Sequence, residues 1–281
     1  MSKTLKQRLS FLRRDWSFAI VLVVMIFFLL TIFIPGVLAP YSPYEQHPQD
    51  ALQPPSRNYW LGTDQFGRDI LSRLIYGGRV ALLVGIGSVA LATLVGVPLG
   101  LVSGYYGGPV DSVIMRVQDA LLAFPAVLLA LLIIASFGAS AVNVVLTIAI
   151  VFIPRFARLV RGSVLALKER EFELASRAIG AKDRRILSHA ILPNTVAPIT
   201  VQVTLGIAIA ILIESGLSYM GLGIQPPTAS WGNMLQHAHS YLYQAPWFVV
   251  ATGAIIFAAV LVFNLAGDRL REIVDPRLRK L

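Results

Sequence analysis

The sequence predicts an all-α, polytopic membrane protein with six transmembrane helices. Hydrophobic residues make up 56% of the 281 residues and charged residues only 14%, whereas charged residues form about a quarter of a typical soluble domain. Apolar segments of about 20 residues, the length that crosses a bilayer as a helix, recur along the chain. The six segments are Trp16–Ala39, Val80–Val102, Ala120–Phe137, Ala141–Val160, Thr195–Ile213 and Trp247–Leu265.

The basic residues indicate how these helices are oriented. Of the 24 Lys and Arg, all but Arg57, Arg68, Arg73 and Arg79 fall in alternating connecting segments or at the expected inner end of the fourth span. Positive charge accumulates in the cytoplasmic loops of membrane proteins. We therefore expect both termini in the cytoplasm, and the net charge of +9 reflects topology in the lipid bilayer rather than nucleic-acid binding.

This pattern divides the chain into four parts. Residues 1–15 form a cytoplasmic N-terminal segment, 16–79 the first transmembrane helix with an outer loop, 80–266 the transmembrane core, and 267–281 a cytoplasmic tail. The core contains a cytoplasmic loop at 161–194. The first apolar run is longer than that of a cleavable signal peptide, so we expect a retained helix. The chain has no cysteine, which excludes disulfides, thiolate metal sites and cysteine nucleophiles.

The outer loop and the second span carry local structural signals. Five prolines between residues 40 and 55 keep the first half of the loop extended. Asp64 is placed to cap a short helix on the outer surface. In the second span, Gly96 and Gly100 form a G-x-x-x-G pair, which favours close packing against a helix that the pattern does not identify.

The third and fourth spans are expected to be antiparallel neighbours, because only Gly138–Ser140 separates them. Asp111 and Asp119 precede the third span, at the inner membrane edge, and are interpreted as solvated side chains. Pro154 and Arg155 lie within the fourth span, which makes it the least regular of the six.

The cytoplasmic loop predicts two short helices joined at a glycine. A helical face through Leu174 ends at Gly180, which can adopt a left-handed conformation. A second helix begins at Asp183 and is expected to end at Pro193, because proline pushes the preceding residue toward extended geometry. The apolar side of this helical pair requires a cover. Either the inner ends of the chain's own helices or the groove of a partner protein can supply it.

The segment Glu171–Asn194 resembles the EAA loop of ATP-binding-cassette (ABC) importer permeases. Ala175, Gly180 and the pair Leu192–Pro193 match its pattern. Leu174, Ser176 and Ala190 depart from it, and Glu173 is the nearest carboxylate to the glutamate position. The segments Leu61–Arg79, Gly221–Leu235 and Phe263–Lys280 resemble the C-type permease of dipeptide, oligopeptide and nickel importers, so the resemblance extends over nearly the whole chain.

This resemblance implies a type I ABC importer permease fold with cytoplasmic coupling helices. It implies a heterodimer with a second homologous permease, two cytoplasmic ATPase subunits and an extracytoplasmic substrate-binding protein, in a bacterial inner membrane. The EAA loop would contact an ATPase through Glu173, Ala175, Ser176, Gly180, Ala181, Leu192 and Pro193. ATP and Mg would bind to the ATPase subunits, and no cofactor is expected in this chain.

The outer side presents a second group of candidate residues. Glu214, Trp231 and Gly232 are candidates for an outer gate or for contact with the binding protein. Glu214 is interpreted as reaching the membrane interface, and Trp231 as an interfacial anchor. His237 and His239 form an H-x-H pair, but these side chains diverge on a helix and no carboxylate lies near them in sequence. No metal site is predicted.

The remaining function classes are weighed by what the chain lacks. No lysine lies in a nucleotide-binding P-loop, and no nucleophile–base pair is recognisable, so no catalytic residue is assigned. The alternative to a permease subunit is a self-sufficient channel or secondary carrier. A proton-coupled carrier usually has ionisable residues deep in the membrane, and none lies near the middle of the six spans.

Overall fold

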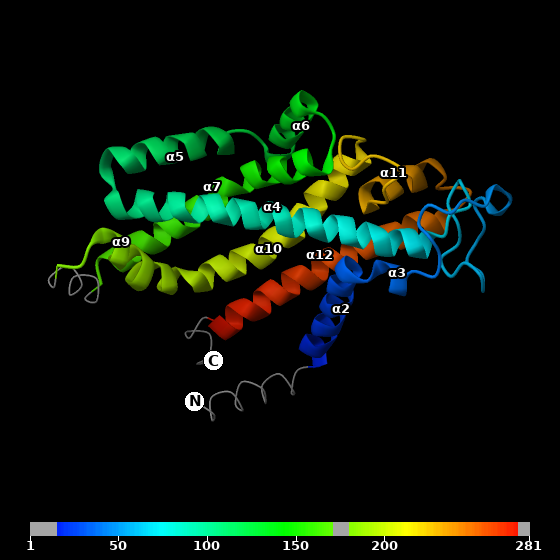
Figure 1. Ribbon diagram of the computed structural model, residues 1–281, viewed down its shortest axis with the longest axis horizontal. Helices are drawn as coiled ribbons and strands as arrows, with labels where there is room; N and C mark the ends of the chain where they lie inside the picture. Colours follow the sequence, from blue (N-terminus) through cyan, green and yellow to red (C-terminus); the bar gives the residue numbers. More distant parts are fainter. Residues whose placement is uncertain (1–15, 171–179, 275–281) are drawn as a thin grey trace.

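The structure, a computed structural model, describes residues 16–170 and 180–274 (Figure 1). Within these ranges the chain is helical and forms no β-strand. The N-terminal helices are α2 (Trp16–Phe33), α3 (Pro35–Leu38) and the 3-10 turn η1 (Pro48–Asp50). The central helices are α4 (Ile70–Tyr106), α5 (Gly108–Leu122), α6 (Ala126–Phe137) and α7 (Ala141–Lys168). The last are α9 (Asp183–Arg185), the π-helical η2 (Ile186–Ile191), α10 (Leu192–Tyr219), α11 (Trp231–Ser240) and α12 (Pro246–Val274).

Four helices in the described ranges are long and apolar enough to cross a membrane. They are α4, α7, the continuous helical stretch formed by α9, η2 and α10, and α12. The pair α5 and α6 adds a fifth span if its two helices together cross the bilayer, and the apolar part of α2 is shorter, at Ala19–Phe33. Each of the six predicted apolar segments is therefore helical, and the chain is a multi-pass membrane protein.

Three helices differ from the expected boundaries. Helix α4 absorbs the predicted surface helix and runs without a break from Ile70 to Tyr106. Its cap is Asp69, which accepts a hydrogen bond from the Ser72 N–H, and not Asp64. Helix α12 continues past the boundary expected at 266–267 and ends at Val274. Helix α7 passes through Pro154 and ends at Lys168.

The expected third span is broken. Helices α5 and α6 meet at 88° across Ala123–Pro125 instead of forming one straight helix. Pro125 caps α6 with an extended ψ of 129°, and a proline disfavours helical geometry in the residue before it. Figure 1 shows α5 lying alongside α4 and α7, with α6 set at a steep angle to α5. Ala130 and Ile134 of α6 are buried in the core.

Helices α4 and α7 form the most extensive helix–helix contact among the described residues, and α7 is the helix that the G-x-x-x-G pair packs against. A Cβ atom on Gly100 would lie 2.5 Å from the Ala157 carbonyl oxygen, and one on Gly96 would lie 2.7 Å from the Phe156 Cβ. Only glycine permits this approach of the two backbones.

The loop before α4 folds into a compact outer cap on buried charges. The Asp64 carboxylate pairs with Arg68 at 2.6 Å and with Arg73 at 3.5 Å, and Arg73 also donates to the Pro43 carbonyl. Burial raises the pKa of the Asp69 carboxyl, although its hydrogen bonds with Ser72 act in the opposite direction. Asp64 therefore organises the loop instead of capping a helix.

Candidate functional site

The glycine corner of the loop 161–194 has the predicted backbone. Gly180 has a φ of +76°, in the left-handed region that favours glycine. A Cβ atom built at this position would meet no other atom within 4 Å, so the requirement for glycine comes from the backbone angle alone. The candidate residues Glu173, Ala175 and Ser176, with Leu174, lie outside the described residues.

The second short helix begins at Asp183, as predicted, and is attached to the bundle there. The Tyr105 hydroxyl, at the inner end of α4, donates to the Asp183 carboxylate at 2.9 Å. The Lys168 ammonium, at the end of α7, donates to the Tyr105 carbonyl at 2.6 Å. The ends of two membrane-spanning helices thus fix the residue that follows the glycine corner by three positions.

The prediction that Pro193 ends this helix is wrong. Leu192 has φ −55° and ψ −45°, and the helix continues through Pro193 to Tyr219. The preceding turns are π-helical from Ile186 to Ile191, with the Leu192 N–H bonded to the Leu187 carbonyl. This wider turn accommodates the proline within the helix, as local π geometry does in other membrane helices.

The described half of the loop is covered by its own chain. Ile186 and Ile191 are fully buried in a cluster with Val160 and Val164 of α7. Ala181 and Leu192 pack on the edge of this cluster. Pro193 is exposed beside it. The sequence left open whether the chain's own helices or a partner protein covers the apolar side of this loop. For the described half of the loop, the chain's own helices cover it.

A second group of ion pairs joins α5 to α7 at the same end. The Asp111 carboxylate accepts from Arg161 at 2.6 Å and 2.5 Å, and it also accepts from the Ser103 hydroxyl. The interpretation of Asp111 as merely solvated is therefore wrong, because its side chain is largely covered and binds an arginine 50 positions away. Asp119 is solvated as interpreted, with 59% of its side chain exposed, and it also pairs with Arg158.

On the outer side, Glu214 is completely buried, at 0% exposure, and does not reach the membrane interface. Its carboxyl group accepts from Ser218 at 2.8 Å and more weakly from Ser215 at 3.4 Å. The Ser218 hydroxyl in turn accepts from the Ile224 N–H at 3.0 Å. Through Ser218, Glu214 is therefore connected to the turn that follows α10.

Trp231 and Gly232 complete this junction. Trp231 is 1% exposed and donates its indole N–H to the Leu74 carbonyl of α4 at 2.8 Å, so it is not a membrane anchor. A Cβ atom on Gly232 would lie 2.2 Å from the Ser215 carbonyl oxygen. The turn 220–230 and α11 together are called the outer hairpin. The three outer candidates lie close together and hold this hairpin against α10 and α4.

The inner and outer candidates lie at opposite ends of one helix. The stretch from Asp183 to Tyr219 forms 37 continuous helical residues. Figure 1 shows α9 at one end of the molecule's long axis and α11 at the other, with α10 between them. The glycine corner and the outer hairpin are therefore connected by one continuous helix.

The H-x-H pair lies on one helix of the outer hairpin. His237 and His239 lie on α11, and the ring of His239 stacks edge-on against Tyr219. Burial, and then the charges of Arg68 and Arg73, lower the pKa of His237. Among the residues that the structure describes, no group of three His, Asp or Glu could hold a metal ion.

Sequence reasoning missed two of the site residues. Tyr105 and Lys168 carry no motif, and Tyr105 is 78 positions from its partner Asp183. The only available signal was their position at the inner ends of predicted spans, where polar side chains are common.

The geometry can be compared with known proteins. Residues 96–280 match the family described as "Binding-protein-dependent transport system inner membrane component". Residues 6–55 match the "N-terminal TM domain of oligopeptide transport permease C". These two matches cover the transmembrane core and the N-terminal part of the chain.

Curated relatives agree over nearly the full length. The chain is 46% identical over 258 residues to the dipeptide transport system permease protein DppC of Alkalihalophilus pseudofirmus, covering 92% of this chain and 84% of that protein. It is 41% identical to a di/tripeptide permease of Pseudomonas aeruginosa, covering 96% and 91%. It is 44% identical to a glutathione transport system permease of Pectobacterium atrosepticum, covering 86% and 81%.

Solved structures share the fold. A chain of the inward-facing MetNI methionine ABC transporter is 18% identical, with a TM-score of 0.59 over 73% of this chain and 98% of that one. A chain of an amino acid ABC transporter gives 0.56 over 72% and 94%. The two family-model matches support a permease subunit and do not support a self-sufficient channel or carrier. The chain belongs to the family of inner-membrane components of binding-protein-dependent transport systems, as a non-catalytic permease subunit of an ABC importer.

Proposed function

We propose that this chain forms half of the translocation pathway of a bacterial peptide importer. The other half would be a second, homologous permease in a heterodimer. Two cytoplasmic ATPase subunits would bind ATP and Mg, and an extracytoplasmic binding protein would deliver the peptide. Three relatives whose names specify dipeptides, di/tripeptides or glutathione support short peptides as the substrate class.

One observation carries the proposed mechanism: a single helical stretch, 183–219, connects the glycine corner with the outer hairpin. Closure of the ATPase pair would displace the segment that contains Glu173, Ala175 and Ser176. The Gly180 corner and the Tyr105–Asp183 hydrogen bond would transmit this displacement into α10. The Glu214 junction would then move the outer hairpin with it.

The orientation follows the distribution of charge. Because basic residues accumulate on the cytoplasmic side, the glycine corner and both termini would lie on the cytoplasmic side of the plasma membrane. The outer cap and the outer hairpin would then face the binding protein. In this arrangement Ala181, Leu192 and Pro193 would lie where the ATPase-contacting segment joins the helix bundle. Ala181 and Leu192 pack on the chain's own core, and Pro193 lies next to it.

Crosslinking of the assembled transporter tests the proposal. The chain has no cysteine, so Ala181→Cys introduces a single thiol beside the corner, and Ser240→Cys supplies a matched site on the outer side. We expect Ala181→Cys to crosslink to an ATPase subunit and Ser240→Cys not to. Peptide uptake by the purified chain alone in liposomes, or crosslinks to the ATPase from Ser240→Cys, would contradict it.

A further inference from the structure

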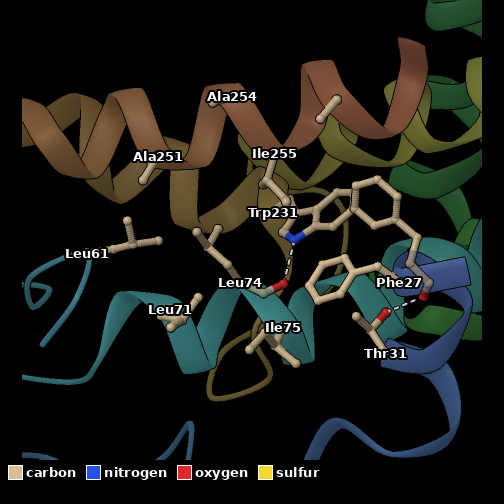
Figure 2. Close-up of a pocket in the computed structure, with 12 residues that line it drawn as sticks. Phe27, Thr31, Leu61, Leu71, Leu74, Ile75, Trp231, Ala251, Ala254 and Ile255 are labelled. Carbon is tan, nitrogen blue, oxygen red and sulfur yellow. Dashed lines mark hydrogen bonds between the residues drawn. The ribbon is translucent and has the colours of Figure 1, made fainter. Parts of the chain in front are cut away.

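The bundle contains an apolar cavity that the proposed coupling path does not use. It has a volume of about 360 Å³ and lies between α2, α4 and α12, with Trp231 of α11 at its base. Figure 2 shows its walls: Leu71, Leu74 and Ile75 from α4 face Ala251, Ala254 and Ile255 from α12, and Phe27 and Thr31 come from α2. Helices α4 and α12 are membrane-spanning, so the cavity lies beside or within the bilayer.

The lining offers no polar group to a ligand. None of the twelve lining residues is charged. The Thr31 hydroxyl donates to the Phe28 carbonyl at 2.6 Å, and the Trp231 indole N–H donates to the Leu74 carbonyl at 2.8 Å. Water needs two or more polar partners to occupy a buried space. Because this cavity does not provide them, water is not expected to fill it.

The cavity is open on its lipid side. Phe27, at its rim on α2, is 40% exposed, and Ala254 on the facing side of α12 is also exposed. No described residue of the chain covers this rim between α2 and α12. Because α12 is membrane-spanning, the hydrocarbon of the bilayer can meet the rim.

We propose that the cavity binds one acyl chain of a membrane phospholipid. An engineered apolar cavity of roughly 150 Å³ accommodates benzene, and this one is more than twice that size. An empty space of this volume would forfeit the dispersion contacts of its lining, and packing contacts are the main force between helices in lipid. A chain inserted between α2 and α12 would fasten α2 to the core.

Tryptophan fluorescence in the complete transporter tests the proposal. The chain has four tryptophans, so replacing Trp16, Trp60 and Trp247 with phenylalanine leaves Trp231 as the only one in this subunit. The transporter is reconstituted with tryptophan-free partner subunits, in phosphatidylcholine whose acyl chains carry bromine, a contact quencher. Because Trp231 is 1% exposed, we expect quenching only if a chain enters the cavity.

A filled cavity provides the matched comparison. Ala254→Phe places a ring at the rim, whereas Val250→Phe adds the same ring on an exposed part of α12 that does not line the cavity. We expect the first to abolish bromine quenching of Trp231 and the second to leave it unchanged. Equal quenching in both variants, or none in the parent protein, overturns the proposal. Absence of quenching would mean that the site is empty or filled by a helix of the partner permease.

A measurement on the unaltered sequence guards against variants that fail to assemble. Phospholipid with a photoreactive group in its acyl chain is irradiated in the native transporter, and the labelled peptides are identified by mass spectrometry. We expect adducts on lining residues such as Leu71 and Ile75, which the bilayer alone does not reach. Adducts confined to exposed residues such as Val250 and Phe257 contradict the proposal.

Discussion

Replacing Glu214 with alanine should detach the outer hairpin from α10 without preventing assembly. Glu214 lies near the end of α10, and its carboxyl group is the shared partner of the Ser215 and Ser218 side chains. Ser218 also accepts a hydrogen bond from Ile224 in the turn 220–230. Alanine removes that partner and leaves both hydroxyl groups buried. The hydrogen bond from Trp231 to α4 remains, so the hairpin is weakened rather than lost.

The size of the effect follows from the bonds removed. A neutral hydrogen bond contributes about 1 kcal/mol net to stability, so losing two costs about 2 kcal/mol. At about 1.4 kcal/mol per tenfold change, this corresponds to roughly a 30-fold shift toward the undocked hairpin. Glu214→Gln is the matched variant, because its amide oxygen can still accept from Ser218 and its shape is unchanged.

Spin labels measure this shift directly. Because the chain has no cysteine, Ser240→Cys on α11 and Leu212→Cys on α10 can be labelled without background. We expect a broadened distance distribution in Glu214→Ala, together with a loss of the ATP hydrolysis that the binding protein stimulates. Glu214→Gln should resemble the parent protein. A narrow, unchanged distribution in Glu214→Ala with full stimulation would refute the assignment of Glu214 as the junction.

Three further substitutions test the inner end and the bundle. Gly180→Val should reduce transport per ATP hydrolysed in proteoliposomes, because β-branched residues resist a φ of +76°. Gly180→Asn should be tolerated. Equal loss of transport in both variants would contradict the argument from the backbone angle. Tyr105→Phe removes one hydrogen bond to Asp183, worth about 1 kcal/mol, and should lower transport by up to about fivefold with assembly intact; no change would exclude this contact from coupling. Gly100→Ala should lower the thermal stability of the purified complex by about 1–3 kcal/mol, whereas Gly162→Ala, where the added Cβ meets open space, should not.

Local properties of the chain could be predicted from residues close together in the sequence. Hydrocarbon cannot satisfy free backbone groups, so every long apolar segment had to be helical. The left-handed conformation of Gly180 is likewise a local property, because only glycine lacks the Cβ that opposes it. The close approach at Gly100 was also predictable, although the identity of its neighbour, α7, was not.

The partners of buried polar groups depended on the tertiary structure. Asp111 was interpreted as solvated because its arginine partner is distant in the chain. Glu214 was interpreted as interfacial because its serine partners resemble ordinary helix residues. Pro193 read as a helix end because sequence rules assume α geometry, and a preceding π turn changes the space available to the ring. The amino-acid order by itself determined which segments enter lipid and where the backbone must turn, since these depend on each residue's own chemistry. Only the folded bundle decided which buried charges meet and that one helix joins the corner to the hairpin, because such contacts require distant segments to be brought together in space.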